Sequence, residues 1–467
     1  MNPKVRVSRH FLRCYMNFKK VNTQSVLSAL SNVRRRHFSD CSQAAGQPFS
    51  IYIHWPYCES KCTYCNFNKY INPASPPNER MLSAMKRELA FYMRHPKFGL
   101  QARKLHSIYF GGGTPTLAPV STIQSIIDEI DKTMGGLHSD IEITIEGNPT
   151  SSEISKLSSL HTIGVNRLSL GIQSLRDEDL PILGRDHNTK DAIHALESAK
   201  RIFGDKGFTF DMIFGRPGNS LDDWQKELKQ ALSIAGDHMS IYQLTLERGT
   251  PLFKDVMAGK LAPIAGQEEL ADMYEHVIEA TAQHGLFHYE VSNYARTTAA
   301  MSRHNFSYWR GMDYIGIGPG AHGRLTQLNG ERLRTFGEFH PERWMAQCED
   351  EGDGIRKMIP MEHRQIPEEL VLFGLRTKLG IPRSRFSTMT GGKKLEDALR
   401  GDVIKSYVEH GLLIDEGKTE NNVQTSAPEF VPADCVSEFY SGTIRPTEKG
   451  LAVIDTIIPN ILKPTDS

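Results

Sequence analysis

The chain alternates short apolar runs with longer stretches in which apolar residues recur every three or four positions. The first pattern is typical of buried β-strands and the second of amphipathic helices. Helices are predicted at 78–94, 120–134 and 190–202, among others. The strands predicted from residue 50 onward are 51–55, 105–110, 141–146, 166–170, 207–213 and 238–245.

This alternation of strand and helix predicts a parallel sheet, because parallel neighbours need a helix-sized connection between them. Six repeats are fewer than the eight of a closed (β/α)8 barrel. We therefore expect an α/β fold built on an open (β/α)6 partial barrel over 45–295. A core extension over 296–360 and a smaller, mostly helical C-terminal domain over 361–467 are predicted to follow.

Polar or glycine-rich signatures stand at the C-terminal ends of these predicted strands. Cysteines follow the first strand, three glycines follow the second, and Glu146 ends the third. Gln173, Arg185 and Asp211 come later and are ambiguous taken singly, as is Glu146, which suits ribose hydroxyls or plain solvent. Barrel active sites are built from the C-terminal ends of the strands. We therefore expect a single site that collects these signatures.

Three of the seven cysteines, Cys58, Cys62 and Cys65, form a CxxxCxxC motif directly after the first predicted strand. Three thiolates with this spacing can occupy three corners of a [4Fe–4S] cluster and leave one iron open to a chelating ligand. The alternative is a structural zinc site with His54 as the fourth ligand. Spacing favours the cluster, because zinc cysteines usually come as two CxxC pairs.

The first 39 residues carry many Lys and Arg residues and no Asp or Glu. An Arg-rich, Ser-containing amphipathic start without acidic residues is typical of a mitochondrial transit peptide. The alternative is a basic tail or a nucleic-acid-binding arm. Because the basic bias stops at Asp40, we predict a transit peptide over 1–40 and a mitochondrial location.

Composition removes two classes of partner. The 467 residues contain 55 Lys and Arg and 55 Asp and Glu, so the net charge gives no general attraction to nucleic acid or anionic membranes. No stretch approaches the roughly 20 apolar residues that cross a bilayer. We expect no nucleic-acid partner and no transmembrane segment, and the oligomeric state stays unassigned.

Five sequence segments, taken together, resemble one branch of a known superfamily. They are Tyr-Ile-His-Trp-Pro-Tyr-Cys-Glu-Ser-Lys-Cys-Thr-Tyr-Cys-Asn-Phe-Asn at 52–68, Gly-Gly-Gly-Thr-Pro-Thr at 111–116, Glu-Gly-Asn-Pro at 146–149, Gly-Val-Asn-Arg-Leu-Ser-Leu-Gly-Ile-Gln-Ser at 164–174 and Asp-Met-Ile-Phe-Gly at 211–215. They resemble the coproporphyrinogen-oxidase-like branch of the radical S-adenosylmethionine (SAM) superfamily. Within that branch the chain is similar to the HemW-type haem chaperones, from about residue 50 to residue 462.

The resemblance implies cofactors and the residues that hold them. Cys58, Cys62 and Cys65 would bind the [4Fe–4S] cluster, whose open iron SAM chelates. Residues 216–219, Arg-Pro-Gly-Asn, depart from the usual Leu-Pro-Gly-Gln of the family, and the resemblance assigns them no role. The positions that line SAM in the family correspond to Tyr52, Tyr64, Gly112, Gly113, Thr114, Glu146, Gln173, Arg185 and Asp211.

Two further features separate the members of this branch. Coproporphyrinogen oxidases carry another cysteine two residues after the third cluster ligand, where this chain has Phe67. HemW-like members have Phe there and a His-Asn-x-x-Tyr-Trp motif, which residues 304–309 match. The resemblance thus implies haem as a ligand and haem-accepting proteins as partners. The alternative function is an oxygen-independent coproporphyrinogen III dehydrogenase.

His304 is the candidate haem ligand in this motif. An imidazole can ligate haem iron axially, and Tyr308 and Trp309 can stack on a porphyrin. The alternative for His304 is a buried, hydrogen-bonded histidine of the core. The chain has 18 histidines, so the residue types alone leave the haem ligand open.

Overall fold

The computed structural model describes residues 47–417 and 428–463. The predicted transit peptide at 1–40 lies outside these residues.

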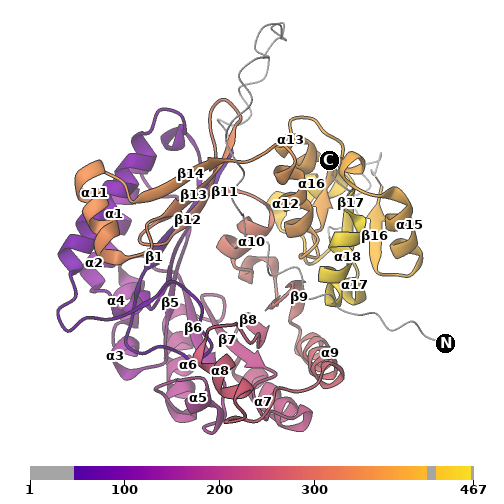
Figure 1. The fold of residues 1–467 in the computed structure, drawn as a ribbon, viewed down its shortest axis with the longest axis horizontal. Helices are drawn as coiled ribbons and strands as arrows, with labels where there is room; N and C mark the ends of the chain where they lie inside the picture. Colours follow the sequence, from indigo (N-terminus) through magenta and orange to yellow (C-terminus); the bar gives the residue numbers. More distant parts are fainter. Residues whose placement is uncertain (1–46, 418–427, 464–467) are drawn as a thin grey trace, which may run out of the picture.

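One mixed sheet of twelve strands forms the centre of the described chain (Figure 1). All six predicted strands are present, and each pairs in parallel with the next along the chain. The strand order ends at β14 on one side and β9 on the other, so the barrel is open, as predicted. The six strands are β1 (Phe49–Trp55), β4 (Leu105–Gly112), β5 (Glu142–Gly147), β6 (Arg167–Gln173), β7 (Phe208–Phe214) and β8 (His238–Gln243).

Helices between the strands cover the outer face of this sheet (Figure 1). In α2 the buried residues include Ile123, Ile126, Ile127 and Ile130, a spacing of three and four that places them on one helix face. Apolar side chains from both layers form one continuous core. The main covering helices are α1 (Asn78–Arg94), α2 (Val120–Met134), α6 (Thr189–Phe203), α7 (Leu221–Ile234) and α9 (Gln267–Gln283).

Side chains alternate across each barrel strand, and the alternation decides which residues reach the interior. In β4, Ile108 and Phe110 join the outer core, while Ser107 and Tyr109 make polar contacts on the opposite face. The same period places Glu146 on the inner face of β5, after Ile143 and Ile145, which join the outer core. Each barrel strand therefore presents polar residues inward, and those at the C-terminal ends line one cavity.

The segment after the sixth repeat returns to the barrel. Strand β11 pairs in parallel with β1, on the side opposite β4, so β1 lies inside the sheet. The prediction counted six barrel strands and did not foresee this seventh parallel strand. The other elements of the segment are β9 (Phe287–Glu290), β10 (Asn293–Ala295), α10 (Arg303–Trp309), β11 (Asp313–Ile317), β12 (His322–Thr326), β13 (Arg332–Gly337), α11 (Pro341–Glu351) and β14 (Ile355–Pro360).

The C-terminal part lies beside the barrel in Figure 1 and has a separate apolar cluster that includes Val371, Phe386 and Ile457. Its helices surround a small antiparallel sheet in the order β15-β17-β16. The predicted domain limits at 295 and 360 fall at the ends of β10 and β14 and stay predictions as domain limits. The elements include α12 (Gln365–Gly374), β15 (Ile381–Pro382), α13 (Arg383–Met389), α15 (Gly401–Glu409), β16 (Leu413–Glu416), β17 (Thr443–Pro446) and α18 (Ile454–Ile461).

Across residues 47–417 and 428–463, the structure contains no helix with the length and hydrophobicity that crossing a lipid bilayer requires.

Candidate functional site

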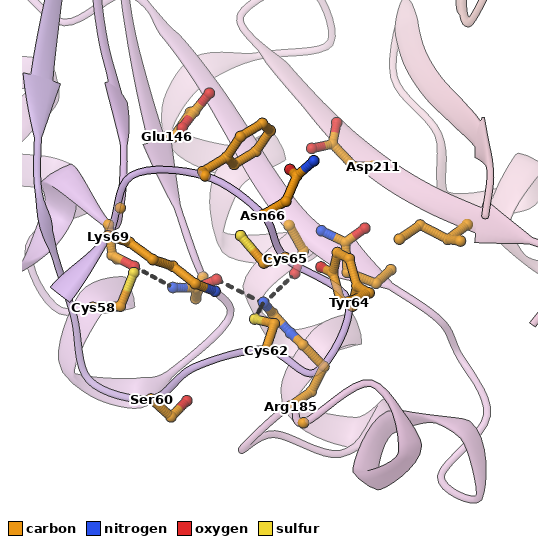
Figure 2. Close-up of a pocket in the computed structure, with 18 of the residues that line it drawn as sticks. Cys58, Ser60, Cys62, Tyr64, Cys65, Asn66, Lys69, Glu146, Arg185 and Asp211 are labelled. Carbon is orange, nitrogen blue, oxygen red and sulfur yellow. Dashed lines mark hydrogen bonds between the residues drawn. The ribbon is translucent and has the colours of Figure 1, made fainter. Parts of the chain in front are cut away.

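A cavity of about 450 Å³ opens at the C-terminal ends of the barrel strands. Its wall combines the cysteine loop after β1 with residues from the ends of β4 to β8. Figure 2 shows Cys62, Cys65 and Arg185 on one side of the space, with Glu146 and Asp211 on strands across from them. One cavity therefore collects residues from separate strand ends: the three cysteines, Gly112, Gly113, Glu146, Gln173 and Asp211.

The cysteine loop is anchored at its ends and in its middle. Its ends pair as two short parallel strands, β2 (Tyr57–Cys58) and β3 (Tyr70–Ile71). In the middle, Thr63 donates to the carbonyl of Leu183 from its backbone nitrogen at 3.1 Å and to that of Ile182 from its hydroxyl at 2.6 Å. These anchors hold the three cysteines of the loop at the cavity wall.

The three cysteines are free thiols that line the same cavity. Burial raises the pKa of the Cys58 thiol, and a hydrogen bond with Thr114 opposes that shift. The guanidinium of Arg185 lies 3.3 Å from Cys62 Sγ and places a positive charge beside this sulfur. Three sulfur donors with a nearby cation suit an anionic iron–sulfur cluster, because such clusters are held by thiolates.

A zinc site with His54 does not fit this geometry. The Nε2 atom of His54 lies 2.8 Å from the carbonyl oxygen of Asn68, and Nδ1 lies 3.0 Å from the hydroxyl of Tyr52. Burial lowers the pKa of His54 to about 4, so the ring is neutral and committed to these partners. In the part of the chain that the structure describes, no three His, Cys, Asp or Glu side chains converge as ligands of one metal ion. A [4Fe–4S] cluster does not need such convergence, because each thiolate binds a different iron of the cluster.

Two of the three glycines at the end of β4, Gly112 and Gly113, are required by neighbouring protein atoms. Gly112 has φ +111°, and a Cβ there would lie 2.5 Å from the His54 ring. A Cβ on Gly113 would lie 2.6 Å from the carbonyl oxygen of Tyr57 and 2.9 Å from that of Trp55. The Gly113 backbone also donates to Trp55 at 2.7 Å. Gly112 and Gly113 therefore let β4 approach the start of the cysteine loop, and both line the cavity as well.

Two carboxylates lie deep in the cavity. Glu146 accepts hydrogen bonds from the Tyr109 hydroxyl at 2.7 Å and from the Gly112 backbone at 3.2 Å. Burial raises the pKa of Glu146. Burial, followed by the charge of Glu146, raises the pKa of Asp211 to about 7, while a hydrogen bond with Ser240 opposes the shift. Both groups can accept hydrogen bonds from a polar ligand in the cavity.

Gln173 and Arg185 occupy adjoining parts of the cavity wall. Gln173 has φ +70° at an irregularity in the pairing of β6 with β7. A left-handed backbone is unfavourable for a residue with a side chain, so the surroundings must hold it in place. Arg185 donates to the carbonyl of Gly171 at 2.5 Å and to the side chain of Asn148 at 2.6 Å, in addition to its contact with Cys62.

The two predicted tyrosines have different surroundings. Tyr64 lines the cavity, and burial raises its pKa. Tyr52 lies behind the cavity wall, where its ring stacks on Tyr109 with a centroid distance of 6.1 Å and its hydroxyl bonds to His54. Tyr52 is therefore the one predicted SAM residue that the structure does not place on the cavity lining.

His304 lies on α10 and has no exposed surface. Its Nδ1 is 2.9 Å from the Ser107 hydroxyl, and its Nε2 is 2.6 Å from the Tyr308 hydroxyl. The ring stacks on Tyr109 at 4.8 Å, and burial, with a smaller contribution from His106, lowers its pKa to about 3. Both nitrogens are thus occupied by protein partners, which corresponds to the core alternative for this residue.

Several residues that shape the site were not singled out from the sequence. Tyr109 links Glu146 to His304, and Asn148 bridges Arg185 and Thr114 through its amide. Tyr242, at the end of β8, is also part of the cavity lining. Tyr109 belongs to the second predicted strand and Tyr242 to the sixth. Their partners come from other strands, so sequence offered no further signal.

Comparison with known proteins agrees with this architecture. Residues 52–231 match the model of the radical SAM superfamily. Radical S-adenosyl methionine domain-containing protein 1, mitochondrial, of Danio rerio is 34% identical over 458 residues, which are 97% of this chain and 94% of the relative. Heme chaperone HemW of Escherichia coli is 31% identical over 79% of this chain and 95% of its own length.

A solved structure shares the fold over almost the full length. Coproporphyrinogen III oxidase HemN of Escherichia coli, a radical SAM enzyme, superposes with a TM-score of 0.69 and covers 90% of this chain and 91% of its own. At 18% identity this likeness concerns the fold alone. The alignments with the two sequence relatives cover 97% and 79% of this chain and 94% and 95% of the relatives. The chain therefore belongs to the radical SAM superfamily, in the family that includes radical S-adenosyl methionine domain-containing protein 1 and HemW.

Proposed function

We propose that this chain binds haem and passes it to haem-dependent proteins in mitochondria, and that it carries a [4Fe–4S] cluster and SAM. The observation that supports this most is the similarity to proteins named heme chaperone HemW, which extends over 95% of the Escherichia coli relative. Phe67 agrees with it: the side chain lines the cavity, is 69% exposed, and has no metal-binding atom. The mitochondrial location is supported by the names of the animal relatives.

In this proposal Cys58, Cys62 and Cys65 hold the cluster. They are free, share the cavity wall, and lie on a loop that three separate anchors fix. When bound, the cluster supplies a redox-active iron with an open coordination position. Arg185 would offset part of the negative charge that three thiolates bring into the cavity.

The SAM assignment concerns the rest of the cavity wall. Glu146 and Asp211 would accept hydrogen bonds from ligand hydroxyl or amino groups, and Arg185 would face negative charge. Gly113 and Thr114 would hold the ligand through backbone and hydroxyl atoms. The other proposed SAM residues are Tyr64, Gly112 and Gln173, and Tyr52 would act from behind the wall.

For the haem iron, His304 is a candidate that the geometry does not favour. Ligation through Nε2 would require the Tyr308 hydroxyl to leave and α10 to open, because the ring has no exposed surface. His322, whose ring is half-buried and packs on Phe336, is the second candidate within the same segment.

A second function, oxygen-independent coproporphyrinogen III dehydrogenase, draws on one observation: Glu146 and Asp211 line the same cavity as the cysteines, and Arg185 lies beside Cys62. The experiment that separates the two reconstitutes the cluster without oxygen, titrates haem, and assays decarboxylation of coproporphyrinogen III. Haem bound at one equivalent without decarboxylation supports the chaperone. Turnover of coproporphyrinogen without retained haem contradicts it and supports the dehydrogenase.

A further inference from the structure

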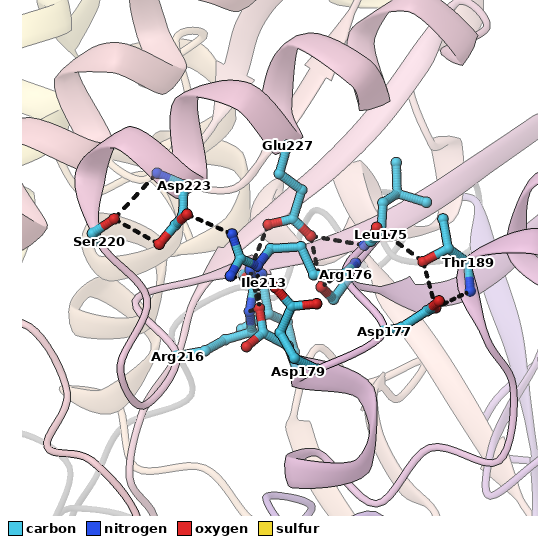
Figure 3. A network of polar contacts seen from close by, with 12 residues as sticks. Leu175, Arg176, Asp177, Asp179, Thr189, Ile213, Arg216, Ser220, Asp223 and Glu227 are labelled. Carbon is cyan, nitrogen blue, oxygen red and sulfur yellow. Dashed lines mark hydrogen bonds and ion pairs between the residues drawn. The ribbon is translucent and has the colours of Figure 1, made fainter.

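Three charged side chains are buried together directly behind the cavity wall (Figure 3). Arg216, Asp179 and Glu227 are 1%, 5% and 3% exposed. They come from the loop after β7, from the short helix α5 (Asp179–Ile182), and from α7. None of the three lines the cavity itself. Ionised groups are this deeply buried only when their charges are paired, and here one guanidinium faces two carboxylates.

Arg216 joins the two carboxylates. Its Nε donates to Asp179 at 3.0 Å, and its Nη2 donates to Glu227. Nη2 also forms an ion pair with Asp179, 2.8 Å from Oδ2. Its Nη1 donates to the carbonyl of Ile213, at the end of β7. The indole of Trp224 lies against the guanidinium, 6.0 Å from ring centroid to Cζ. The guanidinium therefore fixes α5 and α7 relative to the end of β7.

The second oxygen of Glu227 holds the segment that follows Gln173. It accepts hydrogen bonds from the Ser174 hydroxyl at 2.6 Å and from the Leu175 backbone at 2.7 Å. Gln173 itself has the unfavourable φ of +70° and lines the cavity. Because the next two residues are held by Glu227, the network supplies the restraint that this strained backbone needs.

Asp179 restrains the segment that carries Arg185 in the same way. It starts the helix α5, and the Arg185 backbone donates to Leu180 in that helix at 2.9 Å. Arg176 adds a second ion pair to Asp179 at 3.2 Å. One buried arginine is thus connected, through two carboxylates, to both side chains that form this part of the cavity wall.

We propose that Arg216 is a positioning residue for Gln173 and Arg185 and thereby sets the affinity for SAM. The proposal rests on the proposed function, in which these two residues line SAM. Replacing a buried ion pair by apolar groups is often neutral for stability, so stability alone does not explain three buried charges here. The proposal also gives a role to the loop at residues 216–219, where this chain departs from the usual Leu-Pro-Gly-Gln of the family it resembles.

The test measures SAM binding to cluster-reconstituted protein by equilibrium dialysis, with haem binding as a parallel readout. Arg216→Met is expected to weaken SAM binding about tenfold or more, which corresponds to about 1.4 kcal/mol, and to leave haem binding unchanged. Amide hydrogen exchange over 171–185 is expected to accelerate in the same variant. A wild type that binds neither SAM nor haem would contradict the proposed function rather than the role of Arg216.

Arg103→Met is the matched control. Arg103 is also a buried arginine, and it pairs with Asp313 at 2.8 Å. That pair lies at the starts of β4 and β11, at the opposite end of the strands from the cavity. If Arg216 acts only through general stability, both variants will weaken SAM binding to the same extent. That result, or unchanged SAM binding in Arg216→Met, would overturn the proposal.

A double variant supplies the rescue. In Glu227→Gln alone, the new amide nitrogen faces the Arg216 guanidinium and two donors oppose each other. In Arg216→Met with Glu227→Gln, the amide oxygen can still accept from Ser174 and Leu175 without a charge at position 227, and Asp179 keeps its ion pair with Arg176. The double variant is therefore expected to bind SAM more tightly than either single variant. Additive losses would contradict the proposal, and Glu227→Gln carries the test if Arg216→Met does not fold.

Discussion

Replacement of His304 by alanine tests whether this histidine is a core residue of the barrel. The imidazole is hydrogen-bonded through both nitrogens and stacked on Tyr109. Removing it leaves Tyr308 without this partner, while Ser107 keeps its hydrogen bond with Ser50 at 2.9 Å. We therefore expect a loss of stability in protein that has never bound haem.

The size of the loss follows from two contributions. A buried hydroxyl that loses its partner costs about 1–3 kcal/mol. The cavity left by the ring, together with the lost stacking, adds about 2–3 kcal/mol. The sum of about 4 kcal/mol is a large part of the 5–15 kcal/mol that typically stabilises a folded domain.

The stability difference between wild type and His304→Ala depends on pH in a defined direction. Burial holds the pKa of His304 at about 3 in the folded protein, whereas an unfolded histidine titrates near 6.5. Below pH 6.5 the unfolded wild type binds a proton that the folded state does not, so wild type loses about 1.4 kcal/mol per pH unit relative to the variant. Between pH 6.5 and pH 5.0 the difference should narrow by about 2 kcal/mol.

The measurement is urea unfolding of cluster-free protein at several pH values between 7.5 and 5.0, followed by tryptophan fluorescence. The exposed His363 gives the control, because His363→Ala should change neither the midpoint nor its pH dependence. A His304→Ala variant as stable as wild type, or a difference that does not change with pH, would refute the burial argument. In that case a haem-facing His304 would regain support.

Three further changes address the cavity directly. Gly113→Ala would press a Cβ against the carbonyl oxygen of Tyr57, so we expect it to cost about 3 kcal/mol of stability and to lower the iron content after reconstitution. Gly401→Ala, with no atom within 4 Å of its Cβ, should do neither in thermal melts and iron assays. Asp211→Asn should be more stable than wild type at pH 7.5 and little different at pH 4, because the folded pKa of Asp211, about 7, lies above that of an unfolded aspartate. Equal stability differences at both pH values in urea titrations would contradict this prediction. Cys62→Ser should lose the visible absorption of the cluster. Cys348→Ser, at a buried thiol outside the cavity lining, should keep it, and retention in both variants would exclude Cys62 as a ligand.

Local pattern was enough to predict the barrel and the end of it at which polar signatures gather. Glu146 lies at the end of its predicted strand and Asp211 in the fifth strand, and both line the one cavity at that end. Pairing of β11 with β1 joins residues more than 250 positions apart, which no local pattern encodes. The contacts of His304 could not be predicted for the same reason, since its partners Ser107 and Tyr109 belong to a strand that is distant in the sequence.

The Arg216 network shows a second limit of sequence reasoning. A lone arginine after a strand is usually a surface charge. Asp179 and Glu227 do not stand at the sequence separations from Arg216 that would make them neighbours within one helix or one hairpin. Arg216 is paired only because the tertiary fold brings α5, α7 and the end of β7 together. Conversely, the glycine motif was visible in the sequence, but the protein atoms that require it were not.

The position of β1 between β4 and β11 has a consequence for the order of events during biogenesis. As the chain emerges from a ribosome or a translocation channel, β1 and β4 are available long before 313–317. Until then β1 is an edge strand, and contacts between distant segments form slowly. The cysteine loop that leaves β1 is therefore completed on both sides only after most of the chain has appeared. If these cysteines hold the proposed cluster, we expect it to be loaded late in maturation, on a nearly finished barrel.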